Sequence, residues 1–274
     1  KGIPKSVAKD VIVLEYNNPK SLDVIKANRH RLAAVLVEPV QSRCPEIQPQ
    51  LFLQELRAVT QAQGTLLIFD EMVTGFRIHP GGAQAHFNVQ ADLATYSKIA
   101  GGGLPLSIIA GRHGVMDYID GGQWQFDDDS KPQTDTTFFA GTFCRHPLSL
   151  AAARATAIHL LAEGPALQCA LNNKTETLVN RLNACTTEKN LAITFTHFGS
   201  FFAIDLSKSA INTATQNALS IAMLTHGVHL RTGDKGGFLS TAHSDEDIDT
   251  IFQAFSKAFE TLMNIGLLKQ HNNI

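Results

Sequence analysis

The sequence predicts an α/β fold, and two observations lead to that prediction. Short apolar runs alternate with longer patterns of helical period through most of the 274 residues. Several of these runs are continuously apolar or β-branched, which is typical of strands that are covered on both faces in a largely parallel sheet. The strands expected on this basis comprise residues 33–37, 66–69, 93–96 and 107–111.

Helices are expected between and after these strands. Pro49 opens a pattern of apolar residues that Gly64 closes, since proline suits the first turn of a helix and glycine suits the position after its end. An Ala- and Leu-rich stretch at 147–161 and a leucine pattern at 167–182 predict two more helices. Residues 121–133 are polar and are expected to form a solvated loop.

The pattern changes near residue 191, which predicts a smaller α+β domain at 191–274 beside a large domain at 1–190. Ser244 begins the run Ser-Asp-Glu-Asp, which has the form of an N-terminal capping box. The helix expected after it has one apolar face, made of Ile248, Phe252, Phe255, Phe259 and Leu262. The other elements expected in this part are strands at 192–196, 201–206 and 237–241 and a helix at 213–225.

Composition and charge argue against several classes of protein. Hydrophobic residues make up 44% of the chain and charged residues 18%, which argues against disorder. The net charge of -2 removes the electrostatic case for a protein that binds nucleic acid or a membrane surface. No apolar stretch approaches the roughly 20 residues that span a bilayer, and the first residues lack a signal-peptide core, so a cytoplasmic protein is expected. The four cysteines form no CxxC pair; reduced, mostly buried thiols and no metal site are expected.

Three polar groups directly follow predicted strands, namely Glu38, Asp70 and Lys98. Ligands in open α/β sheets bind at the carboxyl ends of the strands, so we expect these groups at one ligand-binding edge. Burial of Lys98 there would favour the neutral amine, which is the form that makes a Schiff base. Two simpler interpretations stay open: Asp70 as the N-cap of a helix, and Lys98 as a surface lysine before a loop.

The residues around Asp70 and Lys98 resemble a known family. The run LIFDEMVTGFR at 67–77, followed by SKIAGGGLP at 97–105, is similar to the signature of class III aminotransferases, which are pyridoxal 5'-phosphate (PLP) enzymes of fold type I. Further pieces of the family pattern are matched in order by EPVQ at 38–41 and by GTF and HPL within 141–148. The resemblance covers nearly the whole chain. It implies the PLP-binding large domain of this fold without its N-terminal part, followed by the smaller C-terminal domain.

This resemblance implies roles for three residues of the signature. Lys98 would bind the cofactor aldehyde as a Schiff base and then act as the general acid and base that moves a proton between Cα and C4′. Asp70 would pair with the pyridinium nitrogen and keep it protonated, so that the ring accepts electrons from the carbanion. Met72 lies two residues on in a segment expected to be extended, and would pack on the ring face from the same side. Its alternative is an ordinary core position.

The same resemblance implies roles for residues outside the signature. Thr142 would bind the cofactor phosphate of the neighbouring subunit, which implies a homodimer with shared active sites. Glu38 and Gln41 would line the pocket near the ring hydroxyl or the substrate. The glycines at 101–103 match neither a dinucleotide-binding nor a P-loop pattern, and are expected to form a tight turn beside Lys98.

A finer resemblance is to the aminotransferase domains of hybrid polyketide synthase/nonribosomal peptide synthetases. Those domains take an amine from a donor such as glutamate and place it on the β-carbon of a β-ketoacyl thioester bound to an acyl carrier protein. Many relatives that act on free amino acids carry a C-terminal arginine for the α-carboxylate; GFLSTAH at 237–243 has none, and Arg231 is the candidate for a displaced equivalent. The segments that carry this resemblance are VEPVQSR at 37–43, IDGGQWQF at 119–126 and TTFFAGTF at 136–143.

Two alternatives to this hypothesis stay open. One is a class III enzyme that acts on free small molecules, such as an ω-amino acid aminotransferase or a glutamate-semialdehyde aminomutase. The other is a non-catalytic fragment that keeps the fold and the dimer surface. The second alternative arises because the family's N-terminal phosphate-binding turn and cofactor-stacking aromatic residue are not found before Glu38.

Overall fold

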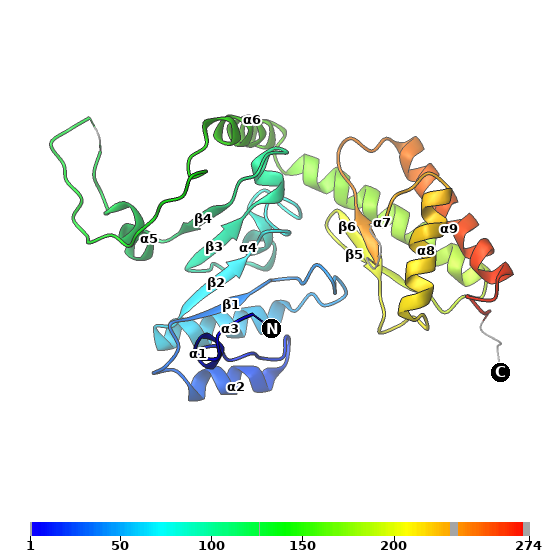
Figure 1. The fold of residues 1–274 in the computed structure, drawn as a ribbon, viewed down its shortest axis with the longest axis horizontal. Coiled ribbons are helices and arrows are strands. Elements are labelled where there is room, and N and C mark those ends of the chain that lie inside the picture. Colours follow the sequence, from blue (N-terminus) through cyan, green and yellow to red (C-terminus); the bar gives the residue numbers. More distant parts are fainter. Residues whose placement is uncertain (1, 126, 231–234, 271–274) are drawn as a thin grey trace.

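The computed structural model describes residues 2–125, 127–230 and 235–270, and within them the chain forms a four-stranded and a three-stranded sheet (Figure 1). The larger sheet has the order β1-β2-β3-β4. Its first three strands run parallel, and β4 is antiparallel to β3. The four strands are β1 (Ala34–Val37), β2 (Leu66–Asp70), β3 (Leu93–Tyr96) and β4 (Ile108–Gly111).

All four strands of the larger sheet lie within one residue of their predicted positions, but their burial differs from the expectation. The central strand β2 buries Leu67 and Phe69 completely. The prediction that every strand is covered on both faces is wrong for β1 and β4, because Leu36 is 66% exposed and β4 is exposed along most of its length. Both are outer strands of the described sheet, so each has a strand neighbour on one side only.

The helix predicted between the first two strands is confirmed as α3 (Gln50–Gln63). Gly64 follows it with φ 70°, the left-handed conformation in which glycine ends a helix. α3 buries Leu53 and Leu56, lies against β2 and packs on α2 (Pro19–Ala27). The shorter helical elements of this half are α1 (Lys5–Lys9), α4 (Gly82–Phe87), the 3₁₀ turn η1 (Lys98–Gly101) and α5 (His113–Asp120).

Two consecutive long helices follow an irregular segment at 121–146. This segment, which we call the arm, has no helix or strand at its described positions, as predicted for its polar first part. The arm extends away from the sheet and returns to α6 (Figure 1). The predicted helices are confirmed as α6 (Pro147–Glu163) and α7 (Pro165–Glu188).

The C-terminal sheet consists of β5 (Phe195–Phe198), β6 (Phe201–Ile204) and β7 (Gly236–Phe238), all antiparallel. β5 begins later than the predicted strand at 192–196. The reason is the two-residue turn at Gly199, which has φ 58° and pairs Phe198 with Phe201. The carbonyl groups of Ala192 and Thr194 instead accept hydrogen bonds from the backbone N–H groups of Ala210 and Asp205.

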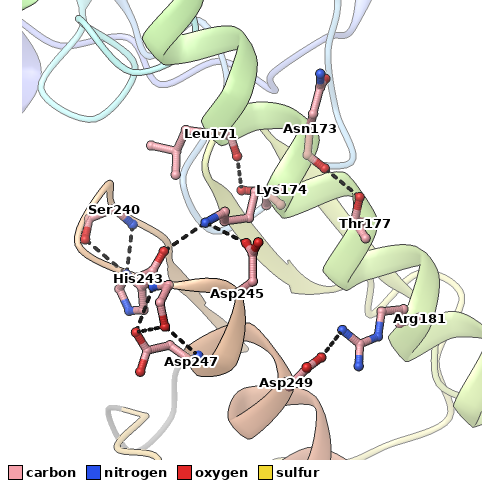
Figure 2. A network of polar contacts seen from close by, with 12 residues as sticks. Leu171, Asn173, Lys174, Thr177, Arg181, Ser240, His243, Asp245, Asp247 and Asp249 are labelled. Atoms are coloured by element: carbon pink, nitrogen blue, oxygen red, sulfur yellow. Dashed lines mark hydrogen bonds and ion pairs between the residues drawn. The ribbon is translucent and has the colours of Figure 1, made fainter.

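Helices α8 (Thr213–Thr225) and α9 (Asp245–Asn264), together with α7, pack against this smaller sheet. The predicted helix at 213–225 is confirmed as α8, and α9 begins at the predicted capping box. The backbone N–H of Asp247 donates to Ser244 Oγ at 3.1 Å, and the Asp247 carboxylate accepts from the Ser244 backbone N–H at 2.8 Å (Figure 2). Both orphan donors at the helix start are therefore satisfied by neighbouring side chains.

The contact between α9 and α7 is apolar at its centre and charged at its rim. Lys174 of α7 pairs with Asp245 at 3.0 Å and Arg181 pairs with Asp249 at 2.7 Å (Figure 2). These carboxylates are mostly exposed, so each pair contributes little to stability. The predicted apolar face of α9 is confirmed, with Phe252 half-buried and the fully packed members being Ile248, Phe255, Phe259 and Leu262.

Two hydrophobic clusters divide the core. One surrounds β1, β2 and α3; the other fills the space between the C-terminal sheet and α7, α8 and α9. α7 contributes to both halves, because Gln168 and Asn172 donate to backbone carbonyls at Phe76 and Ile78, whereas its later leucines join the C-terminal cluster. The domain boundary at residue 190 stays a prediction.

Cysteine burial and membrane-spanning potential can also be compared with the sequence. All four cysteines are free thiols, but only Cys185 is buried. The expectation of mostly buried thiols is wrong because Cys144 lies in a turn of the arm and Cys169 lies on an uncovered face of α7. No helix in the described part of the chain combines the length and apolarity needed to cross a membrane.

Candidate active site

The carboxyl ends of the three parallel strands bring Glu38, Asp70 and Lys98 to one edge of the sheet. The pairing of Val37 with Phe69 puts the following residues, Glu38 and Asp70, level with each other. Asp70 pairs with Thr95, and Lys98 follows three residues later. Burial raises the pKa of the Glu38 carboxyl; the negative charge of Asp70 raises it further, and the positive charge of Lys98 lowers it. The three groups therefore share one electrostatic environment, as predicted from their positions after the strands.

Asp70 is held in place by one of its two carboxylate oxygens. Oδ1 accepts a hydrogen bond from the Met72 backbone N–H at 3.0 Å and another from Thr95 Oγ1 at 3.4 Å. Oδ2 has no hydrogen-bond partner among the described residues, so one acceptor of this half-buried group is available to a ligand. Asp70 is thus oriented by the protein and still able to bind a cationic N–H.

The placement expected for Met72 is wrong in its geometry. Residues 72–77 form a series of turns rather than an extended segment, so the side chains of Asp70 and Met72 do not share a side through strand alternation. The cause is local: the short Asp70 side chain binds the amide two residues on, which bends the chain. Met72 is half-buried, and its contact with a cofactor ring stays a prediction.

Lys98 begins η1 with φ 50°, a left-handed conformation that is uncommon outside glycine. The preceding residue, Ser97, donates from Oγ to the carbonyl of Leu106 at 2.6 Å, which closes the loop over the glycines. Of the two interpretations left open for Lys98, the structure supports the surface position, because its side chain is exposed on this turn beyond the sheet. Nζ of Lys98 has no ion pair in the described chain, so no protein group holds it away from a ligand.

The glycines after Lys98 form the predicted tight turn. Gly102 has φ 59° and Gly103 has φ 87°. A Cβ atom on Gly102 would also lie 2.7 Å from the carbonyl oxygen of Ala152 on α6, whereas one on Gly103 would meet open space. Gly102 therefore allows α6 to pack directly against the Lys98 turn, a role that the sequence pattern did not indicate.

Glu38 and Gln41 line a pocket of about 500 Å³ between β1, α2 and the segment at 10–16. The Ser42 backbone N–H donates to Glu38 Oε1 at 2.9 Å. Tyr16, which was not predicted as a site residue, also lines the pocket and donates its hydroxyl proton to the carbonyl of Pro39. Burial and the charge of Glu38 both raise the pKa of Tyr16, so this phenol stays neutral. A single tyrosine before a helix gives no sequence signal for such a role.

Glu71 supports the turn that follows Asp70. Its side chain is 1% exposed and accepts hydrogen bonds from Thr74 Oγ1 at 3.0 Å and from the backbone N–H of Ala83 at 2.6 Å. Burial raises the pKa of Glu71, although these donors oppose the shift. The carboxyl group lies at the start of α4, where Gly82 leaves room for it. Glu71 thus ties α4 to the strand end that carries Asp70.

One predicted site residue, Thr142, is not brought to this edge. Thr142 lies in an exposed turn of the arm, and no hydrogen bond joins it to Glu38, Asp70 or Lys98 within the described chain. Its predicted role in a neighbouring subunit is therefore not tested by a single chain. Arg231 lies outside the described residues.

Comparison with known proteins places these features in a family. Residues 8–259 match the family described as Aminotransferase class-III. The glutamate-1-semialdehyde 2,1-aminomutase of Ruminiclostridium cellulolyticum is 34% identical over 98% of this chain and 61% of its own length. An ω-transaminase from Sphaerobacter thermophilus has a similar structure, with TM-score 0.82 and 28% identity over 94% of this chain and 59% of that one. A structure described as a transaminase with PLP bound gives TM-score 0.85 and 25% identity over 97% of this chain and 61% of that one.

These comparisons confirm the α/β fold that the resemblance implied. The chain spans about three fifths of the length of the relatives that it matches. The family match includes every strand of both sheets and all three polar groups at the carboxyl edge. The chain belongs to the class-III aminotransferase family.

Proposed function

We propose that this protein is a PLP-dependent aminotransferase or aminomutase that acts on free small molecules, with Lys98 as its catalytic residue. The observation that carries the proposal is the meeting of Glu38, Asp70 and Lys98 at the carboxyl edge of the parallel strands. This edge is where open α/β sheets bind ligands. A related structure described as having PLP bound supports the choice of cofactor.

The residues at this edge fit the cofactor. Asp70 offers Oδ2, which has no partner among the described residues, to the ring nitrogen, and Lys98 offers an unpaired amine to the aldehyde. Met72 is close enough in sequence to contact the ring, and Gln41 lies with Glu38 on the neighbouring strand end. When bound, the cofactor supplies an electron sink that stabilises negative charge on the carbon bearing the amine.

The chain's own groups then perform binding and proton transfer. Asp70 keeps a proton on the ring nitrogen, because a carboxylate with one free oxygen is a good acceptor for a charged N–H. The Lys98 amine, exposed and unpaired, would take the proton from the substrate Cα and deliver it to C4′ of the cofactor. Glu38, which lies level with Asp70 at this edge, would orient the substrate together with Gln41.

A free small molecule is the acceptor that the comparisons favour. The curated relative from Ruminiclostridium cellulolyticum is a glutamate-1-semialdehyde 2,1-aminomutase, and the matched ω-transaminase is named for amine transfer. We therefore infer that glutamate or a similar amino acid supplies the amine. In the alternative, an aminomutase reaction, the donated amine and the accepting carbonyl belong to one substrate.

A carrier-bound β-ketoacyl thioester is the second candidate acceptor. The observation in its favour is the segment at 237–243, which contains no arginine that could bind a free α-carboxylate. The acyl carrier protein would then be a partner of this protein. The comparisons give this acceptor less support than the free small molecules.

A homodimer with shared sites completes the proposal. The arm and α6 expose large apolar side chains, including Phe138, which is 90% exposed, and Phe143, which is 80% exposed. Patches of this kind mark protein interfaces. Thr142 lies within this patch. If a second copy packs against the patch, Thr142 of one copy would lie near the cofactor phosphate of the other.

The experiment combines a spectrum with an assay. Incubation with PLP should produce visible absorbance, and the protein should then transaminate glutamate with free keto acids or isomerise glutamate semialdehyde. Lys98→Ala should abolish both, whereas Lys257→Ala, which changes an exposed lysine on α9, should abolish neither. Turnover of carrier-bound thioesters alone would establish the second acceptor. Absence of absorbance and of all turnover would identify a non-catalytic protein and overturn the proposal.

A further inference from the structure

The opposite edge of the large sheet holds a second pocket of about 530 Å³, whose lining is different in kind from that of the Lys98 edge. The pocket lies at the amino ends of β2 and β3, where the chain enters these strands at Thr65 and Asp92. Lys98 follows the far end of β3. The two places are therefore separated by the full length of a strand, and a ligand in one does not touch the other.

Two arginines share a single carboxylate at this pocket. Asp92 Oδ2 accepts a hydrogen bond from Arg57 Nη1 at 2.8 Å, and Asp92 Oδ1 forms an ion pair with Arg112 Nε at 2.9 Å. Oδ2 also accepts from the backbone N–H of Leu67. Burial alone would raise the pKa of Asp92, but the Leu67 amide and the two guanidinium groups hold it below its ordinary value. One negative charge thus faces two positive charges, and the lining keeps a net charge of one positive unit.

Both guanidinium groups keep donors that no protein group uses. Arg57 donates hydrogen bonds only from Nη1, to Asp92 and to the Gln90 carbonyl. Arg112 contacts Asp92 only through Nε. The remaining Nη groups have no hydrogen-bond partner in the described part of the chain. Guanidinium groups bind carboxylates and phosphates through two parallel N–H groups, so these free edges are suited to an oxyanion.

Two buried donors in the same wall are also unsatisfied. Thr65 is 3% exposed, and its hydroxyl has no hydrogen-bond partner among the described residues. Nε of Arg57 is also buried and has no hydrogen-bond partner there. Buried polar groups in folded proteins are almost always paired, so two orphans beside one cavity point to a missing polar group. The residue Arg112 is also the N-cap of α5, whose positive end favours negative charge at this place.

We propose that this pocket binds a small oxyanion, a carboxylate or phosphate compound, between the guanidinium groups of Arg57 and Arg112. Neutral amides at Gln61 and Asn88 complete the lining, and no carboxylate other than Asp92 faces the cavity. The site is independent of the proposed transamination.

The test is a titration followed by NMR of the arginine Nε–H signals. Inorganic phosphate and succinate are each added at constant ionic strength, with and without saturating PLP, so that occupancy of a cofactor site is recognised separately. We expect the Arg57 and Arg112 signals to shift to saturation with at least one anion. Arg112→Gln should weaken that binding about tenfold or more, because Arg112 is exposed at 59% of its side chain and its removal spares the core.

Two further variants make the result decisive. Arg29→Gln removes an exposed arginine that does not line this pocket and should leave binding unchanged. Arg112→Lys keeps the charge but loses the planar donor pair, so intermediate affinity is expected; it also replaces Arg112→Gln should that variant unfold. A linear, non-saturating response that is equal in all variants, or saturable binding that survives loss of Arg112, would overturn the proposal.

Discussion

Arg77 donates a hydrogen bond of 2.7 Å from Nη1 to the hydroxyl of Ser200, and this contact joins the turn after Asp70 to the C-terminal sheet. Both residues are buried. Nε of Arg77 donates to the Val73 carbonyl, and the guanidinium lies 4.8 Å from the centre of the Phe238 ring. Burial lowers the pKa of Arg77 to about 10, so the side chain stays charged at neutral pH. The strand end that carries Asp70 is therefore braced from the other half of the molecule.

Replacing Arg77 should destabilise the protein. Arg77→Met removes a charge-assisted hydrogen bond and leaves buried acceptors unpaired, with an expected loss of about 2 kcal/mol in the free energy of unfolding. Urea unfolding followed by circular dichroism measures the change. The exposed Arg29→Gln variant should shift the free energy by less than about 0.5 kcal/mol. Equal effects of the two substitutions would show that the brace contributes nothing.

The raised pKa of Glu71 predicts a pH dependence of stability. The folded protein holds the proton on Glu71 more tightly than the unfolded chain does, so this residue contributes stability at low pH that is lost as pH rises above about 4.5. Glu71→Gln lacks this titration. Its deficit in unfolding free energy relative to the original protein should therefore shrink between pH 4.5 and 7. A deficit that grows over this range would contradict the prediction.

Asp92 should show the opposite pH dependence. Its folded-state pKa is lowered, so it contributes stability above its ordinary value of 3.8 that is lost as pH falls through the folded-state value. Asp92→Asn leaves Arg57 and Arg112 without their shared carboxylate, and should cost about 3 kcal/mol at pH 7. Thermal unfolding at pH 7 and at pH 3 measures both values. A cost that is the same at the two pH values would disprove the role of the charge.

Two adjacent glycines provide a matched pair for the Lys98 turn. Gly102→Ala combines a positive φ with a clash against the Ala152 carbonyl and should cost more than 2 kcal/mol, roughly the strain of one residue plus overpacking. Gly103→Ala carries only the positive φ and should cost about 1 kcal/mol. Denaturant unfolding compares them, and PLP uptake should be weaker in Gly102→Ala. Equal stability of the two variants would exclude the packing role of Gly102.

Much of the fold was predictable because its signals are local. Gly64 ends α3 and Ser244 begins α9 through hydrogen bonds to residues within a few positions, so short sequence patterns reveal them. The start of β5 differs from the prediction, although its signal is also local. The two-residue turn at Gly199 sets the register of β5 with β6 and so fixes where β5 begins. The antiparallel direction of β4 has no local signal, because an apolar run reads the same in both directions.

Some features of the candidate site were predictable from the sequence and others were not. The positions of Asp70 and Lys98 after apolar strands, together with the family resemblance, were enough to name them. The sequence could not decide whether Lys98 is buried or exposed and did not predict the bend at Met72, because both depend on turns whose hydrogen bonds form only in the folded chain. Tyr16 and Gly102 were missed because their partners lie far along the sequence.

The sequence by itself determined the positions of the helices and of the strands other than β5, and which polar groups follow the strands, because these features depend on side-chain chemistry within a few residues. Tertiary structure alone decided that Arg77 meets Ser200, and that Arg57 and Arg112 share Asp92. Such pairs join residues that the chain separates widely. Only packing of the sheet against its helices brings them this close, and burial of Arg77 and Asp92 then strengthens their contacts.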